Sequence, residues 1–289
     1  MKSPTLKKIL TTLGNIFTLA AVFYLLLTLL ENANRLKIEF SSVLPVVAVL
    51  FCCTHCIQAF IIQLLLNKKT GYRALLKIHC TSQVYKYVPG NVAHYFSRWL
   101  YLRRQGVDAR DNARLIVNET LLLVTSFGLL GVAFLAVAPR PRVPAALPHP
   151  AVIACIGLAA LALAGYFFRK KTGVIFNVKN VIVLLLYGLS ALLSGAILCL
   201  LSAFMVPDLA GIGFVQYTLG FAVAFLAGFV VPGSPGGIGV REFVFVEIFT
   251  YGGCEAYLVT QVIVLYRLMA IVVELLMYCM TKWVVKDAA

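Results

Sequence analysis

The chain is a series of long apolar runs separated by short polar segments. A helix needs about 20 apolar residues to cross a bilayer. The pattern predicts membrane helices over 9–30, 42–66, 115–138, 151–168, 181–204, 212–231 and 257–283. A further apolar piece, 243–251, is short for a full span, so six or eight crossings are both open. We therefore expect an all-α integral membrane protein, a single helical bundle formed by residues 1–289.

One of these runs ends in a break. Residues 209–240 form an uncharged stretch of 32 residues, but its positions 232–239 hold two prolines and four glycines. These residues remove backbone donors and permit left-handed conformations, so a regular helix cannot continue. Non-helical backbone at membrane depth is tolerated where protein buries it or where it lines a cavity. Because the charged pair Arg241-Glu242 follows at once, we interpret the break as the floor of a polar cavity.

A second break resembles the first in its spacing. Pro89-Gly90 precedes Arg98 as Pro232-Gly233 precedes Arg241, and in both cases the arginine is the ninth residue after the proline. Matching interruptions in two halves are typical of inverted-repeat transporters, here with repeats of about 1–140 and 150–289. The alternative is that Pro-Gly is a common turn dipeptide in an arginine-rich chain. The pattern leaves both open, and it also leaves open whether the broken segments are re-entrant.

Composition and charge favour a membrane setting and disfavour nucleic acid. The chain is 61% hydrophobic with a formal charge of +14, and basic residues gather in 67–114 and 169–179, beside membrane helices. Such residues mark cytoplasmic loops that face anionic lipid. We therefore expect a multi-pass protein of the cytoplasmic (inner) membrane with both termini inside. No nucleic-acid motif accompanies the charge, so no nucleic-acid partner is predicted.

The motifs of common enzymes and metal sites are missing from the sequence. It has no G-x-S-x-G, H-E-x-x-H or P-loop motif, so neither an enzyme nor a cofactor is predicted. Cys53, His55 and Cys56 have a zinc-like spacing, but no second ligand pair matches it, which favours packing. Without an ATP site, any transport is driven by an ion gradient or simply equilibrates.

Arg98 and Arg241 are the first candidates for binding a phosphate. A guanidinium stays charged and meets phosphate oxygens through two parallel hydrogen bonds. Helix N-termini after the two breaks would direct further backbone donors at the same anion. The alternative is that both arginines lie at the cytoplasmic interface and extend to headgroups.

Several other ionisable residues lie within or beside apolar sequence. Glu119, Glu242 and Glu247 are expected to form ion pairs or to carry a proton during coupled transport. Adjacent residues point to different faces of a helix, so Glu242 is not expected to bond Arg241. Arg267 and Glu274 are seven residues apart and share one helix face, where they would line a cavity or pair with other helices. His94 is a further titratable candidate, or else an interfacial anchor.

Two segments carry a family resemblance. YVPGNVAHYFSRWLYLRRQGV, 87–107, and PGGIGVRE, 235–242, resemble the lysylphosphatidylglycerol-synthase transmembrane family of flippase-like membrane proteins. The resemblance implies translocation of a lipid with a phosphate-bearing headgroup. Well-known members carry an aminoacyl-transfer domain after the membrane part, and we expect a member without it. Many relatives have glycine and an acidic residue where this chain has Ala93 and His94, so its headgroup can differ.

The sequence therefore predicts a lipid translocase for a phospholipid or a polyprenyl-phosphate-linked sugar. One alternative is a membrane-embedded enzyme acting on a lipid phosphate headgroup. Another is a non-transporting partner of a membrane glycosyltransferase, since stand-alone relatives resemble such partners. The predicted substrate-binding residues are Pro89, Gly90, Asn91, Arg98, Gly236, Gly237, Gly239, Arg241, Glu242 and Arg267. The predicted ion-pair or proton-coupling residues are His94, Glu119, Glu242, Glu247 and Glu274.

Overall fold

The computed structural model describes six stretches of the chain and three single positions. They are 23, 27, 30, 42–66, 70–87, 93–137, 178–209, 211–231 and 237–284. Every regular element within these stretches is a helix, which confirms the predicted all-α membrane fold. The predicted helix 151–168, and 9–30 apart from the single positions, lie outside the described residues.

Four long helices form the outer frame of the molecule. They are α2 (Val43–Leu65), α5 (Ala109–Val137), α7 (Val178–Met205) and α10 (Ala256–Val284). Among the described residues, these are the helices long and apolar enough to cross a membrane. Their ends agree closely with the sequence pattern except in α5, which was expected to begin at residue 115. The earlier start is fixed by Asn112, whose buried side chain donates a 2.9 Å hydrogen bond to the carbonyl oxygen of Trp99.

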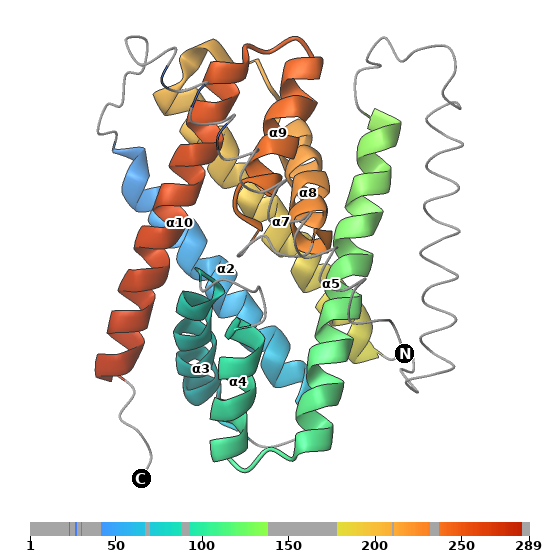
Figure 1. Cartoon of the computed structure of the whole chain (residues 1–289), viewed down its shortest axis with the longest axis vertical. Coiled ribbons are helices and arrows are strands. Elements are labelled where there is room, and N and C mark those ends of the chain that lie inside the picture. Colours follow the sequence, from blue (N-terminus) through green and yellow to red (C-terminus); the bar gives the residue numbers. More distant parts are fainter. Residues whose placement is uncertain are drawn as a thin grey trace.

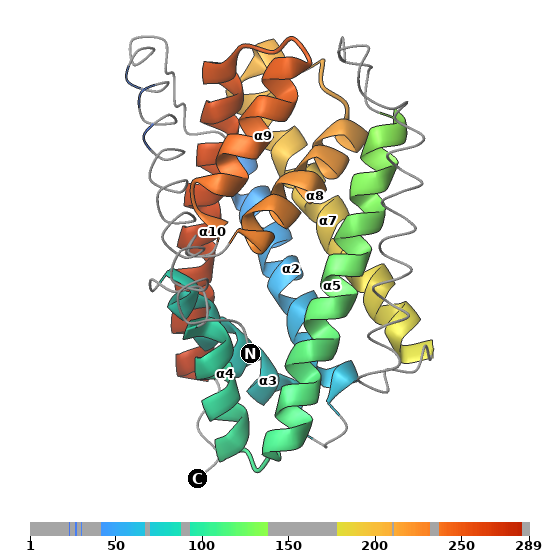
Figure 2. The same cartoon turned by 45° about the vertical axis from the view of Figure 1, so that its right-hand side comes forward.

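Four short helices form two hairpins inside this frame. The first consists of α3 (Tyr72–Val84), the 3₁₀ turn η2 (Tyr85–Tyr87) and α4 (Ala93–Arg104). The second consists of α8 (Phe214–Val230) and α9 (Val240–Tyr251). Figures 1 and 2 show α3 and α4 in the lower half of the molecule and α8 and α9 in the upper half. The hairpins therefore enter from opposite ends, and described residues that flank their breaks line one cavity.

The first hairpin corrects the sequence interpretation of 67–114 as a cytoplasmic loop. Leu75, Ile78 and Leu102 are buried in a small apolar cluster with Ile62 and Leu115. On the same helices the basic residues Arg73, Arg103 and Arg104 are exposed. A hydropathy window averages the apolar and the basic residues, which is why such a hairpin reads as a polar loop.

The same order of elements occurs on both sides of the undescribed stretch 138–177. A long helix, two short helices and a long helix follow one another as α2, α3, α4 and α5, and again as α7, α8, α9 and α10. The hairpins of the two sets point in opposite directions (Figure 1). This is the arrangement that the inverted-repeat interpretation requires.

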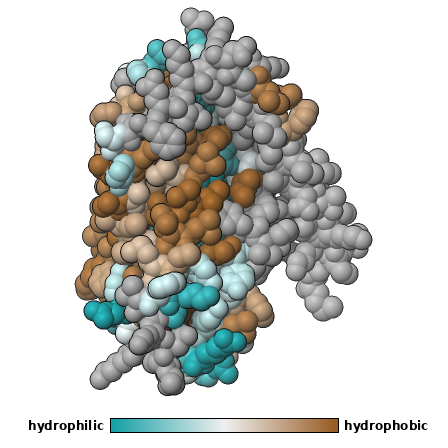
Figure 3. Space-filling view, turned by 90° about the vertical axis from the view of Figure 1, so that its left-hand side faces the viewer, coloured by the Kyte–Doolittle hydropathy of each residue, from teal (hydrophilic) through white to brown (hydrophobic). Residues whose placement is uncertain are grey.

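The surface of the molecule is divided by polarity along its long axis. Figure 3 shows a broad hydrophobic band on one face, with hydrophilic residues toward the ends. The start of α3, the turn from α4 to α5 and the end of α10 share the lower end in Figure 1. Basic side chains exposed on these segments are Arg73, Arg103, Arg104, Arg110, Arg114 and Lys282. The band and the basic end are those of a protein lying across a membrane.

Candidate functional site

The two broken motifs meet at one cavity. It has a volume of about 400 Å³ and lies between the tips of the hairpins. Lys86, His94 and Arg98 line it from the first hairpin, and Gly237 and Arg241 line it from the second. The predicted residues Pro89, Gly90, Asn91 and Gly236 lie outside the described residues.

Among the described residues, Arg241 is the cation in this cavity that has no carboxylate partner. It is the second residue of α9 and lies at the tip of the second hairpin. Its guanidinium carbon lies 4.4 Å from the centroid of the Phe225 ring and 5.9 Å from that of Phe221. None of the described carboxylates is within ion-pair distance, and its Nε is buried without a hydrogen-bond partner. A half-buried charge without a counter-ion is costly, so an anion is the ligand that the position favours.

Glycines allow the broken backbone to approach this guanidinium closely. Gly237 has φ +75°, and a Cβ added there would lie 3.3 Å from Arg241 Nη2. A Cβ at Gly228 of α8 would lie 3.1 Å from the Arg241 Cβ. Gly239, with φ +82°, precedes the first residue of α9. The positive φ angles at Gly237 and Gly239 cost little conformational energy only for glycine, which explains why the break needs this residue type.

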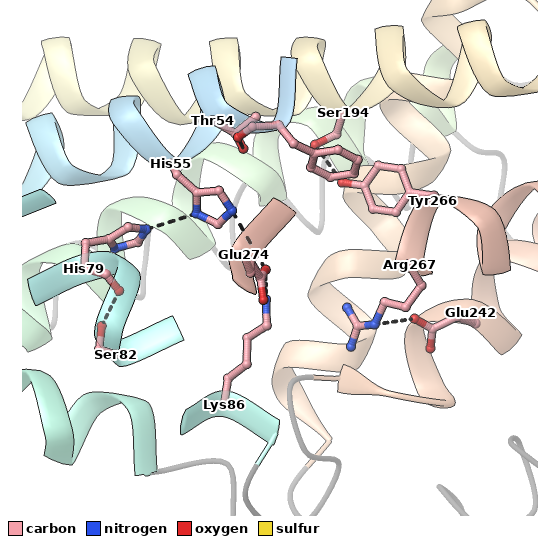
Figure 4. A network of polar contacts seen from close by, with 11 residues as sticks. Thr54, His55, His79, Ser82, Lys86, Ser194, Glu242, Tyr266, Arg267 and Glu274 are labelled. Carbon is pink, nitrogen blue, oxygen red and sulfur yellow. Dashed lines mark hydrogen bonds and ion pairs between the residues drawn. The ribbon is translucent and has the colours of Figure 1, made fainter. Parts of the chain in front are cut away.

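Glu242 begins the helix that carries Arg241. Its Oε2 accepts a 2.7 Å hydrogen bond from the backbone N–H of Gly239. Its Oε1 forms an ion pair with Arg267 Nε at 3.4 Å (Figure 4). The side chain is buried and is not part of the cavity lining, so the structure places Glu242 behind the site and not among its lining residues. As expected from the helix geometry, it does not pair with Arg241.

Arg98 has a different environment from Arg241. It is 3% exposed, and its Nη1 donates a 2.9 Å hydrogen bond to Glu119 Oε1 while its Nη2 donates to Glu119 Oε2. Both residues line the cavity. Because this two-pronged pair uses the donors that a phosphate would need, Arg98 is placed as an ion-pair residue and not as a free phosphate ligand.

Arg267 and Glu274 both face the cavity from α10, but with different partners. Arg267 pairs with Glu242, and Glu274 pairs with Lys86 of η2 (Figure 4). Lys86 escaped the sequence reasoning because it stands in the basic stretch that was interpreted as a loop. Its position three residues before Pro89 is the signal that could have identified it.

Two histidines extend the polar network from Glu274. His55 Nε2 lies 3.9 Å from Glu274 Oε1, and His55 Nδ1 lies 3.3 Å from His79 Nε2 (Figure 4). Cys53 is exposed, so it does not share a site with His55. No group of three or more His, Cys, Asp and Glu residues in the described part of the chain could hold a metal ion.

Two further predicted residues have contrasting positions. His94 lines the cavity, and its ring centroid lies 3.9 Å from that of Tyr95. Glu247 is exposed and lines a different hollow of about 1050 Å³, together with Asp208 and Glu255. Glu247 therefore lies apart from the site that brings the other candidates together.

The charges around the cavity do not cancel. Its described cations are Lys86, Arg98, Arg241 and Arg267. The carboxylates that pair with them are those of Glu119, Glu242 and Glu274. Among the described residues, four cations thus have three paired carboxylates, so one positive charge is in excess and it lies at Arg241. The arrangement can bind an anionic group in a partly apolar, aromatic-lined space.

No protein-family model matches the chain, and no curated protein matches it. The geometry of the cavity is therefore the main basis for assigning a function.

Proposed function

We propose that this chain is a translocase for a lipid with a phosphate-bearing headgroup, which it moves across the cytoplasmic membrane without altering it. The observation that carries the proposal is the position of Arg241. It is a half-buried cation without a carboxylate partner among the described residues, and it lines the cavity that residues of both hairpins share. The motif resemblance at 87–107 and 235–242 supports the same function.

The mechanism follows from the chemistry of the site. Arg241 binds the phosphate through two parallel hydrogen bonds, and the headgroup neutralises the excess charge of the cavity. The acyl or isoprenoid tails stay in the surrounding bilayer. The two hairpins and their framing helices then rock about the bound headgroup and expose it to one side and then to the other. The end rich in basic residues faces the cytoplasm in this proposal.

The remaining cavity lining suits a headgroup that carries hydroxyl groups. Gln58, Ser190 and Ser194 supply polar atoms, and Phe225 and Tyr266 supply aromatic surface. Glycerol or sugar hydroxyls can bond to the former, and a sugar ring can pack on the latter. The candidate cargoes are therefore a phospholipid or a polyprenyl-phosphate-linked sugar, and the sugar cargo would bring a glycosyltransferase partner.

The proposal is tested by measuring headgroup flipping in proteoliposomes that contain the purified protein. We expect flipping of a fluorescent phospholipid or of a short-chain polyprenyl-phosphate sugar by the wild type. Arg241→Gln should abolish it, and Arg241→Lys should retain part of it because the charge remains but the two-pronged geometry is lost. Arg104→Gln is the matched control, since Arg104 is exposed at the end of α4 and lies outside the cavity.

Three results would contradict the proposal or its site. If flipping persists in Arg241→Gln, Arg241 is not the residue that binds the phosphate. A chemically altered lipid in place of flipping would favour the membrane-embedded enzyme. Co-purification with a glycosyltransferase, without flipping of either lipid, would favour the non-transporting partner.

A further inference from the structure

We propose that Lys86 is a second phosphate-binding residue and that Glu274 is a built-in counter-ion which the phosphate must displace from it. The inference rests on the proposed function and assigns a further residue and a regulating contact to the same site. Arg241 would therefore bind the phosphate directly, whereas Lys86 would bind it only after separating from Glu274.

The positions of the three side chains make the exchange possible. Lys86, Glu274 and Arg241 line one cavity, so an anion held by Arg241 shares its space with the Lys86–Glu274 pair. The side chain of Glu274 is only 4% exposed and that of Lys86 is 17% exposed. Little water screens the charges there, so an arriving phosphate acts strongly on the Lys86 ammonium.

The chemistry of lysine suits a residue that changes partner. Its ammonium is a compact charge with three donors on a flexible stem, so it can turn from a carboxylate to a phosphate oxygen nearby. Arg98 is the contrasting case. Two parallel hydrogen bonds to Glu119 fix its planar group, and a single rotation cannot transfer it to another anion.

Glu274 has a replacement partner when Lys86 leaves. Its Oε1 lies 3.9 Å from His55 Nε2, and His55 Nδ1 lies 3.3 Å from His79 Nε2. In the tautomer in which His79 donates to His55 Nδ1, the proton of His55 is on Nε2 and points at Glu274. The buried carboxylate therefore gains an N–H donor and is not left alone. Arg241 and Arg267 are the other charged groups that act on this region.

The Lys86–Glu274 pair also has a special place in the fold. It joins the tip of the first hairpin to α10 in the second half of the chain. The pairs Arg98–Glu119 and Arg267–Glu242 each lie within one half. Exchange of Lys86 from Glu274 to a phosphate thus loosens a contact between the halves, which couples headgroup binding to their relative movement.

Binding of dioctanoyl phosphatidylglycerol to the purified protein in detergent tests this inference by calorimetry. Glu274→Gln releases Lys86, so we expect about tenfold tighter binding, the size of a typical coupling between sites. Lys86→Gln should weaken binding, and the double variant Lys86→Gln/Glu274→Gln should bind no more tightly than Lys86→Gln alone. Glu247→Gln is the matched control, because it removes an exposed carboxylate that is not part of the cavity lining and should change nothing.

Each other outcome has a definite meaning. If Glu274→Gln raises the affinity equally in the wild-type and the Lys86→Gln background, the inference is overturned, because Glu274 would then act on the lipid through its charge alone. Unchanged affinity in Glu274→Gln, with binding abolished by Arg241→Gln, would overturn it and leave the proposed function standing. Absence of wild-type binding to phosphatidylglycerol would overturn the inference for this lipid and would remove it as a cargo in the proposed function. Glu274→Asp, which keeps the charge but shortens the side chain, serves if Glu274→Gln does not fold, and unchanged affinity there would also overturn the inference.

Discussion

At the scale of single residues, the two arginines that follow the breaks have opposite environments. Each stands nine residues after the proline of a Pro-Gly pair, and the sequence therefore predicts the same role for both. Arg98 meets Glu119, which lies 21 residues further along the chain, whereas Arg241 meets aromatic rings. This difference arises where α4 packs beside α5, and local spacing along the chain carries no information about it.

The first prediction concerns the stability of the Arg98–Glu119 pair. Arg98→Gln leaves a buried carboxylate without its cation, so we expect a loss of about 3–5 kcal/mol of folding stability. The double variant Arg98→Gln/Glu119→Gln should recover most of it, because neither charge is then left unpaired. Thermal unfolding in detergent measures both. Equal stability of the single and double variants would show that the pair is not coupled.

Sequence reasoning at this scale identified charged residues but not their partners. Arg267 and Glu274 were placed on one helix face from their spacing, and the structure has both at the cavity. Lys86 was missed, although it forms an ion pair with Glu274, because the basic stretch around it was interpreted as a loop. Partner choice depends on which helices meet, and that is a property of the packed bundle.

At the scale of elements, the hairpins depend on close contacts between short helices. The second break was predicted from its prolines and glycines, since these exclude a regular helix whatever surrounds them. The helices α3 and α4 were not predicted. Their stability comes from tertiary packing, of α3 against α2 and α10 and of α4 against α3 and α5, which composition alone does not reveal.

The second prediction concerns the contact between α7 and α8. A Cβ added at Gly195 would lie 2.9 Å from the Thr218 Cα, so Gly195→Ala must push these helices apart. We expect a destabilisation of about 1–3 kcal/mol by overpacking, reduced in part by the better helix propensity of alanine. Gly188→Ala is the control on the same helix, since nothing lies within 4 Å of its added Cβ. The unfolding midpoint of Gly195→Ala should be lower than that of the wild type, and the midpoint of Gly188→Ala should be higher. Equal midpoints of the two variants would contradict the close contact between α7 and α8.

At the scale of the whole molecule, the distribution of charge along the long axis gives the bundle a direction. Exposed basic residues surround the turn between α4 and α5, and Asp208, Glu247 and Glu255 lie near the opposite end. Hydrophobic pattern and composition were sufficient to predict an all-α membrane protein. They could not fix the number of crossings, because α9 has 12 residues and could be interpreted as part of a span or of a hairpin.

The third prediction concerns orientation. Asp108 is exposed beside the turn from α4 to α5, and Glu255 is exposed between α9 and α10. In a background without the natural cysteines, Glu255→Cys should react with a membrane-impermeant thiol reagent added to intact cells. Asp108→Cys should react only after permeabilisation, because basic ends stay in the cytoplasm. The reverse pattern of labelling would invert the proposed orientation.

The single excess positive charge at Arg241 has an electrical consequence for the proposed transport cycle. A headgroup with one negative charge makes the loaded site neutral, so membrane voltage acts on the empty site alone. A full membrane crossing by one charge is worth about 2.3 kcal/mol per 100 mV. The energy scales with the fraction of the membrane field that Arg241 crosses during the cycle. An inside-negative potential would draw the positively charged empty site toward the cytoplasmic side. The resting voltage of the cell would then decide on which face the next lipid is collected.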